Sequence, residues 1–240
     1  MKNLRKASVL SEVTHVFFDF AGTLVEGVPN WEHPQIVACA ECGVSVTPAQ
    51  VKAAIWNVWG PIEGCAHPEA SVDEQSYAIW IGEIERRILA GLGVTGAGLD
   101  AAVHRVTQLQ IAPACYRVYP DVEPTLAALQ RRGLRLGVVS NFAWQLPNLL
   151  HELGLAQYVD VVLTSARVGY RKPRPEIFVQ ALTQASARAE NALYVGDDPE
   201  CDVKGAQNAG LHALLLDRRH MPAQGQIQTL REVPRRLEIA

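Results

Sequence analysis

Polar side chains stand at the ends of several apolar runs in this 240-residue chain. Asp19 closes the run HVFFD, Ser140 closes LRLGVVS, and Lys172 lies in RKPRPEIF, between an apolar run and a helix-like segment. An acidic cluster follows the apolar run ALYVG and consists of Asp197, Asp198 and Asp202. A carboxylate nucleophile, a hydroxyl, an ammonium and further carboxylates form a set that could transfer a phosphoryl group.

The chemistry of this set depends on its charges. Several carboxylates in one cleft repel one another unless a cation lies among them, and hard oxygen ligands favour Mg²⁺. A Ser hydroxyl and a Lys ammonium at the same place favour a phosphate, and the ammonium would also stabilise a pentacoordinate transition state. Each residue alone has an ordinary explanation, as a turn residue, a helix cap or a solvated lysine. Their joint occurrence at one sheet edge is what indicates a catalytic site.

Five short β-rich runs would position these residues. Several are nearly continuous in Val, Leu and Phe, which is typical of parallel strands buried on both faces. Helix-like segments separate the last four runs, so the pattern predicts an α/β fold with a Rossmann-like parallel sheet. Ligands bind outside the carboxyl ends of such strands. The runs are 15–20, 134–141, 158–165, 192–198 and 212–218, and the helical segments are 122–133, 144–155, 174–187 and 202–211.

The chain between the first two runs is too long for a simple crossover. It has helical patterning, with Thr47 as a predicted N-cap before Pro48, and with Ser71 and Glu74 at the spacing of a capping box. We therefore expect an inserted helical cap domain over residues 26–114. The core domain would then comprise residues 1–25 and 115–240.

Composition limits the classes of partner. Apolar residues make up 48% and charged residues 20% of the chain, and the net charge is −3. These values predict a soluble globular protein without a nucleic-acid or membrane partner. No apolar stretch approaches the roughly 18 residues of a membrane span, and the N-terminal segment lacks the apolar centre of a signal peptide. We expect a monomer or a homodimer.

Five cysteines, an odd number, do not suggest a disulfide framework. The expected location is therefore a reducing cytoplasm. Cys39 and Cys42 form a C-x-x-C pair in a helix-like segment without a second pair at zinc spacing. Two buried thiols are the preferred interpretation of this pair, and a redox or metal role is the alternative.

The segments FFDFAGTL, VVSN, GYRKPRPEIF and VGDDPECDVKGAQNAG resemble the four motifs of the haloacid dehalogenase superfamily of hydrolases. The resemblance covers the core, and the helical insertion resembles the family's type 1 cap. It implies that Asp19 is a nucleophile that forms an aspartyl-phosphate. It further implies that Ser140 binds the transferring phosphoryl group and that Lys172 holds Asp19 and the phosphate in register.

The resemblance also implies a Mg²⁺ site. Asp19, Asp197 and the backbone carbonyl of Ala21 would bind the metal directly, and Asp202 would hold the metal or its waters. Asp198 matches a variable position of the family and is a weaker candidate. Substrate binding would fall on three neighbours of the motif residues, namely Gly22, Thr23 and Asn141.

Ala21 departs from the usual phosphatase pattern. Most phosphatases of the superfamily have a second Asp at this position, which protonates the leaving group and then activates water. Such acid–base catalysis contributes roughly 10²- to 10⁴-fold to the rate. Three explanations remain open: a good leaving group such as an acyl or aryl phosphate, an acid or base supplied by the cap, or a weakly active or non-catalytic relative.

Other branches of the superfamily also lack the second Asp. Phosphonoacetaldehyde hydrolases have a similar D-x-A-G-T motif and use a cap lysine, for which Lys52 is the only candidate between residues 26 and 114. Dehalogenases lack the motif-four acidic pair and carry an arginine near the cap entry, whereas this chain keeps Asp197 and Asp202 and has no such arginine. Candidates for the lining of a cap pocket are Trp31, His33, Trp56, Trp59 and His67.

The preferred function is therefore a Mg²⁺-dependent phosphatase that acts on a small phosphorylated metabolite through an aspartyl-phosphate. The alternatives are a hydrolase of P–C bonds similar to phosphonoacetaldehyde hydrolase, a 2-haloacid dehalogenase, and a catalytically weak relative that binds a phosphorylated ligand.

Overall fold

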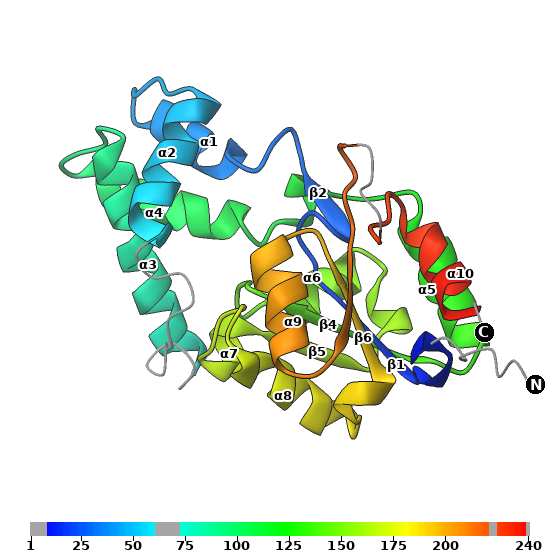
Figure 1. Cartoon of the computed structure of the whole chain (residues 1–240). Coiled ribbons are helices and arrows are strands. Elements are labelled where there is room, and N and C mark those ends of the chain that lie inside the picture. Colours follow the sequence, from blue (N-terminus) through cyan, green and yellow to red (C-terminus); the bar gives the residue numbers. More distant parts are fainter. Residues whose placement is uncertain (1–8, 61–72, 221–224, 239–240) are drawn as a thin grey trace, which may run out of the picture.

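The computed structural model describes residues 9–60, 73–220 and 225–238 (Figure 1). Its centre is a five-stranded parallel sheet with the strand order β5-β4-β1-β6-β7. The α/β, Rossmann-like prediction is confirmed, and each strand lies inside its predicted run. The strands are β1 (His15–Phe18), β4 (Arg135–Ser140), β5 (Val161–Thr164), β6 (Ala192–Gly196) and β7 (His212–Leu215).

Both faces of this sheet are covered, which explains the continuous apolar runs. Phe18 on one face belongs to a core formed with α5 (Val122–Arg131), α6 (Leu146–Glu152) and α10 (Val233–Glu238). Phe17 on the other face packs in a second core with α8 (Pro175–Ala185) and α9 (Gly205–Asn208). Alternate residues of β1 therefore serve opposite layers.

The chain after β6 differs from the prediction of one helix over 202–211. It forms a π-helix, η7 (Pro199–Lys204), which continues into α9. A Cβ on Gly205 would lie 2.9 Å from the Phe178 ring and 3.0 Å from Pro173 Cα. Glycine at this position therefore allows the helix to approach α8 closely. The remaining short helices are η1 (Val9–Glu12), η4 (Pro113–Cys115), η5 (Ala156–Tyr158), α7 (Ser165–Val168), η6 (Ala189–Asn191) and η8 (Leu230–Glu232).

A second, two-stranded sheet joins the core to the inserted segment. The strands β2 (Val25–Gly27) and β3 (Tyr116–Val118) are antiparallel, with Val25 opposite Val118. No pattern in the sequence indicates this ribbon. The two connections between core and insertion thus run side by side, and the exact domain limits at residues 25 and 115 stay a prediction.

The described residues of the insertion form four α-helices, which gather at one end of the molecule (Figure 1). They are α1 (His33–Glu41), α2 (Pro48–Trp59), α3 (Glu74–Gly91) and α4 (Gly98–Leu109). The predicted N-cap Thr47 is confirmed, and it forms a capping box with Gln50. The N-cap of α3 is Asp73, which accepts a hydrogen bond from Ser76 N at 2.7 Å. Ser71, the predicted cap, lies outside the described residues.

The cysteines in the described part of the chain are free thiols. Cys39 is buried in the core of the insertion, and Cys42 Sγ donates to the Gly98 carbonyl at 3.5 Å. This environment supports the interpretation as packed thiols. Cys65 lies outside the described residues. No helix among residues 9–60, 73–220 and 225–238 has the length and apolarity needed to cross a membrane.

Candidate active site

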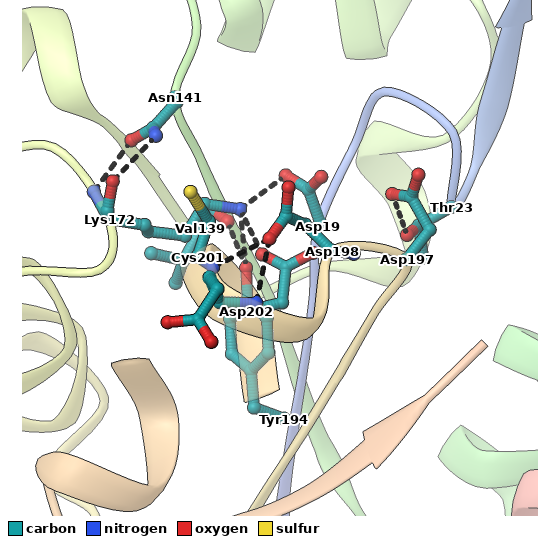
Figure 2. A network of polar contacts seen from close by, with 11 residues as sticks. Asp19, Thr23, Val139, Asn141, Lys172, Tyr194, Asp197, Asp198, Cys201 and Asp202 are labelled. Carbon is teal, nitrogen blue, oxygen red and sulfur yellow. Dashed lines mark hydrogen bonds and ion pairs between the residues drawn. The ribbon is translucent and has the colours of Figure 1, made fainter. Parts of the chain in front are cut away.

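The register of the sheet brings the predicted motif residues to one edge. Phe18 lies level with Val138 of β4 and Val195 of β6, and Asp19 N donates to the Val195 carbonyl at 3.0 Å. Asp19, Ser140 and Asp197 therefore stand next to one another at the carboxyl ends of three adjacent strands. Figure 2 shows Lys172 in contact with Asp19 and Asp202, and shows Asp197 nearby, bonded to Thr23.

Lys172 is the centre of this network and is only 2% exposed. Its Nζ lies 2.7 Å from Asp19 Oδ1, 2.5 Å from Asp202 Oδ1 and 2.9 Å from the Tyr194 hydroxyl (Figure 2). Burial opposes the charged form, but the two carboxylates outweigh burial and raise the pKa of Lys172. The ammonium is therefore fully paired and stays protonated.

The side chain of Asn141 fixes the backbone of Lys172. Asn141 Nδ2 donates to the Lys172 carbonyl at 3.0 Å, and Lys172 N donates to Asn141 Oδ1 at 2.8 Å. This reciprocal pair connects the end of β4 to the loop that precedes α8. Asn141 thus positions the lysine, whereas a direct contact of Asn141 with substrate stays a prediction.

Tyr194 belongs to this site, although the sequence analysis did not identify it. Its hydroxyl accepts from Lys172 and donates to the Val139 carbonyl at 2.6 Å, and its ring packs edge-on against Phe178. Tyr194 lies in the middle of β6, where every residue is buried. The only signal in the sequence is one polar-tipped residue within the apolar run ALYVG.

Three carboxylates form a group with the geometry of a cation site. Asp19, Asp197 and Asp202 each offer one oxygen, and these oxygens lie within 4.8 Å of one another. Partial desolvation, together with the carboxylates of Asp19 and Asp202, raises the pKa of Asp197 to about 7. Burial raises the pKa of Asp202 to about 6, against the opposing effect of Lys172. Crowded hard oxygen donors of this kind fit Mg²⁺.

The loop after Asp19 holds Asp197 in place. Gly22 has φ +83°, and a Cβ there would lie 2.4 Å from Asp197 Oδ2, so both the turn and the close approach require glycine. Thr23 Oγ1 donates to Asp197 Oδ1 at 3.2 Å. Arg218 donates to the Thr23 carbonyl at 2.8 Å and binds Asp121 through two hydrogen bonds of 3.0 Å. Substrate binding by Gly22 and Thr23 stays a prediction.

Asp198 forms hydrogen bonds that stabilise the start of η7. Its Oδ1 accepts hydrogen bonds from Glu200 N at 2.8 Å and Cys201 N at 2.7 Å, so it caps η7. Its own backbone N donates to Asp202 Oδ2 at 3.0 Å. The residue thereby orients Asp202, and these contacts give no support for direct metal binding by its side chain.

A cavity of about 410 Å³ adjoins this site between the core and the insertion. Ala21 and Asn141 border it from the core, and Asn30, Glu85 and Arg171 are also among the lining residues. Aromatic rings form part of the wall. The rings belong to Trp31, Trp59, Tyr77, Trp80, Tyr116 and Phe142.

The predicted pocket residues divide into two groups. Trp31 and Trp59 line the cavity, whereas His33 does not, and Trp56 is 67% exposed and also stays outside the lining. Lys52 is exposed on α2 and is not among the lining residues. The structure therefore gives no support to a Schiff-base lysine at that position. His67 lies outside the described residues.

Comparison with known proteins defines the family. A family model for haloacid dehalogenase-like hydrolases matches residues 13–210. This chain therefore belongs to the haloacid dehalogenase-like hydrolases, as the motifs indicated. Its helical insertion corresponds in position to the cap that the resemblance implied.

Individual relatives and structures agree with this assignment. The chain is 43% identical to mouse haloacid dehalogenase-like hydrolase domain-containing protein 3 over 105 residues, which is 44% of this chain and 42% of that protein. It is 34% identical to phosphoserine phosphatase of Thermus thermophilus over 153 residues, or 62% of this chain and 60% of that protein. The chain thus spans less than two thirds of these curated relatives.

The fold also matches a solved structure. The HAD phosphatase from Thermococcus onnurineus superposes with a TM-score of 0.60 at 24% identity and covers 95% of this chain and 99% of that chain. At this level of identity the match establishes the fold alone.

Proposed function

We propose that this protein is a Mg²⁺-dependent phosphatase that hydrolyses a small phosphorylated substrate through an aspartyl-phosphate on Asp19. The observation that carries the proposal is the ion pair between Lys172 and Asp19, beside the three-carboxylate group. The phosphatase names of several relatives support the same reaction, among them phosphoserine phosphatase, ribulose-1,5-bisphosphate 5-phosphatase and glyceraldehyde 3-phosphate phosphatase.

In the proposed reaction an oxygen of Asp19 attacks the phosphorus atom, and the bond between phosphorus and the leaving oxygen breaks. The leaving oxygen takes the electron pair of that bond. Water then attacks the phosphorus of the aspartyl-phosphate, which releases inorganic phosphate and restores the carboxylate. Lys172 and Ser140 orient the phosphoryl group, and the Lys172 ammonium stabilises the negative charge that develops on it.

Mg²⁺, bound by Asp19, Asp197 and the Ala21 carbonyl with Asp202 in support, would neutralise charge on the phosphoryl oxygens. The acidic pair of residues 197 and 202 favours this reading over a metal-independent dehalogenase. Desolvation and the nearby carboxylates of Asp19 and Asp202 raise the pKa of Asp197 to about 7, and a divalent cation among these carboxylates would offset their mutual repulsion.

Ala21 narrows the range of leaving groups. Ala21 is one of the residues that line the cavity, and it stands at the position where most phosphatases of this family carry a carboxyl. A leaving group in that cavity would depart without a proton from this residue. Esters of acidic alcohols, such as aryl phosphates, need no such proton and are the favoured substrates.

The test is phosphate release from a panel of aryl, acyl and alkyl phosphates in the presence of Mg²⁺. We expect Asp19→Asn to lower turnover of the best ester by at least about 10³-fold. Chelation of Mg²⁺ is expected to abolish turnover, and re-addition of Mg²⁺ to restore it. Asp19→Asn with unchanged turnover would refute the covalent mechanism.

Lys52→Ala serves as the matched control, since Lys52 is an exposed lysine outside the cavity. Its activity on phosphate esters is expected to equal that of the parent protein. If instead the parent protein cleaves phosphonoacetaldehyde, and Lys52→Ala abolishes both this cleavage and trapping by borohydride, the P–C hydrolase is the correct function. Measurable Mg²⁺ binding without phosphate release from any ester would favour the non-catalytic relative.

A further inference from the structure

A buried carboxylate borders the cavity at a distance from the strand-end site. Glu85, in α3, is 1% exposed, and its side chain accepts hydrogen bonds from Gln110 Nε2 at 2.6 Å and from Gln35 Nε2 at 3.0 Å. Both donors are neutral amides. No Lys, Arg or His in the described part of the chain forms an ion pair with Glu85.

Burial of the Glu85 carboxylate without a paired cation destabilises the folded protein. A role in binding a ligand would explain why such a residue is present. Burial raises the pKa of Glu85, while the hydrogen bonds from Gln110 and Gln35 favour its ionised form. Buried carboxylates are usually paired with a cation, because neutral donors replace only part of the lost hydration. A cation that arrives with a ligand would supply the missing charge.

The walls around Glu85 suit such a cation. The rings of Tyr77 and Trp80 lie 6.1 Å apart, and both border the cavity. Aromatic ring faces attract ammonium groups. Asn30 also lines the cavity, and its buried Oδ1 has no hydrogen-bond donor among the described residues.

The one cationic residue among the cavity-lining residues described belongs to the core side. Arg171 precedes Lys172 directly, and its guanidinium lies 4.5 Å from the centre of the Trp59 ring. The cavity therefore has positive charge next to the loop of Lys172 and negative charge on α3. This polarity matches a molecule with a phosphate at one end and an amine at the other.

We propose that the cavity selects phosphate monoesters whose leaving group carries a protonated amine, and that Glu85 is the residue that binds this amine. The ammonium would donate to the Glu85 carboxylate, with Asn30 Oδ1 as a further acceptor. The apolar body of the leaving group would pack between the aromatic rings. As a choice of substrate class, this inference rests on the proposed phosphatase activity.

The sharpest test uses two isosteric aryl phosphates, tyramine O-phosphate and 4-propylphenyl phosphate. They differ by an ammonium in place of a methyl group, and neither requires an acid at position 21. We expect the parent protein to prefer the amine in kcat/KM by roughly 10- to 100-fold, the range of a charge-assisted hydrogen bond. Glu85→Gln is expected to reduce this preference to less than about 3-fold, mainly through slower turnover of the amine ester.

The control is Glu83→Gln, which removes the same charge from the exposed face of α3, where the Glu83 side chain is 64% exposed. It is expected to keep the preference of the parent protein. Equal kcat/KM for the two esters in the parent protein would overturn the proposal. A tenfold or greater loss on both esters in Glu85→Gln would also overturn it, since that result assigns Glu85 to acid–base catalysis or to structure.

A hydroxyl analogue tests the charge itself. If 4-(2-hydroxyethyl)phenyl phosphate equals tyramine O-phosphate as a substrate, Glu85 recognises a neutral donor and the amine assignment is wrong. A binding measurement separates this inference from the phosphatase proposal: calorimetric titration with phenethylamine in the presence of saturating inorganic phosphate. Binding that Glu85→Gln abolishes supports the amine site even if no ester is hydrolysed. If phenethylamine does not bind the parent protein, the amine site is contradicted, whatever the result of the phosphatase assay.

Discussion

Two buried charged side chains lie in the two halves of this protein, one in the core and one in the helical insertion, and their surroundings differ. Lys172, at the ends of the core strands, is 2% exposed and contacts two carboxylates and a phenol hydroxyl. Glu85, in the helical insertion, is 1% exposed and contacts two neutral amides. One charge is thus neutralised within the chain, and the other is not.

The two buried charges can serve different purposes, because one has its countercharge within the chain and the other lacks it. The Lys172 ammonium is held by several fixed partners, so it needs no rearrangement when charge develops on a nearby phosphoryl group. The Glu85 carboxylate has hydrogen bonds but no countercharge, so a ligand that brings the countercharge gains affinity. The first arrangement favours catalysis, and the second favours selection.

Lys172→Met removes the countercharge from the neutralised half. We expect a loss of about 3–5 kcal/mol in the free energy of unfolding, because a carboxylate pair is left buried without its cation. Phosphatase activity is expected to fall to background. The measurement is urea unfolding at pH 5 and pH 8, with and without Mg²⁺, since Mg²⁺ should restore more stability to the variant than to the parent protein.

The raised pKa values of the carboxyl groups determine how the stability loss in Lys172→Met changes with pH. A carboxyl whose folded pKa is raised, as for Asp197 at about 7 and Asp202 at about 6, stabilises the fold below its unfolded pKa, and this contribution disappears as pH rises through the folded pKa. The loss in Lys172→Met should therefore be smaller at pH 5 than at pH 8. Lys204→Met is the control, because the exposed pair with Glu200 contributes at most about 1 kcal/mol. Equal losses in both variants would contradict the prediction.

Ala21→Asp places a carboxyl at the border between the two halves. We expect alkyl phosphates to gain roughly 10²-fold in turnover, because the new residue can protonate a poor leaving group. Aryl phosphates should gain little. Steady-state phosphate release measures both, and Ala21→Asn controls for side-chain size. No gain on alkyl phosphates would mean that the acid comes from elsewhere or that chemistry does not limit turnover.

Tyr194→Phe weakens the neutralised half without changing its charge. It removes one of the acceptors of Lys172 and leaves the Val139 carbonyl without its 2.6 Å donor. We expect a loss of about 1–2 kcal/mol in the free energy of unfolding. The same change at half-buried Tyr158 is the control. Thermal or urea unfolding distinguishes them, and an equal effect at both positions would argue against the network.

The parts of this site that could be predicted from the sequence are local. Asp19, Ser140 and Asp197 follow strands whose apolar runs are continuous, and Gly22 marks the turn. Short patterns were therefore enough to predict the sheet and the edge at which these residues meet. The three-residue strands Val25–Gly27 and Tyr116–Val118 are too short for a periodic signal, and they pair across 91 positions, from Glu26 to Arg117.

Tyr194 and Glu85 could not be predicted for a different reason. In the sequence Tyr194 has the pattern of an ordinary strand residue. Its role depends on the contact with Lys172, which comes from a distant loop. Glu85 lies in the segment EIERR, whose charges are typical of a solvated helix face. Its burial depends on Gln35 from α1 and on Gln110, which directly follows α4, and this packing between distant segments has no signature in the sequence.

Glu85→Gln should affect stability in the direction opposite to Lys172→Met. Since burial raises the pKa of Glu85, the folded protein holds this proton more tightly than the unfolded chain does. Glu85 therefore stabilises the fold below its ordinary pKa of 4.5, and this contribution disappears as pH rises through the folded value. The glutamine does not titrate. We expect the variant to be more stable than the parent protein by about 1 kcal/mol at pH 8 and by a smaller margin toward pH 5.

Addition of phenethylamine gives a second test of the stability difference between Glu85→Gln and the parent protein. It should raise the free energy of unfolding of the parent protein and leave that of Glu85→Gln unchanged, so the ligand would narrow the difference between the two. In Glu83→Gln we expect no pH-dependent difference in stability from the parent protein and the same stabilisation by phenethylamine. The reason is that the Glu83 carboxylate is already solvated. A variant that is less stable at every pH would mean that the hydrogen bonds from Gln35 and Gln110 outweigh the cost of the buried charge. Glu85 would then resemble Lys172, as a charge already satisfied within the chain.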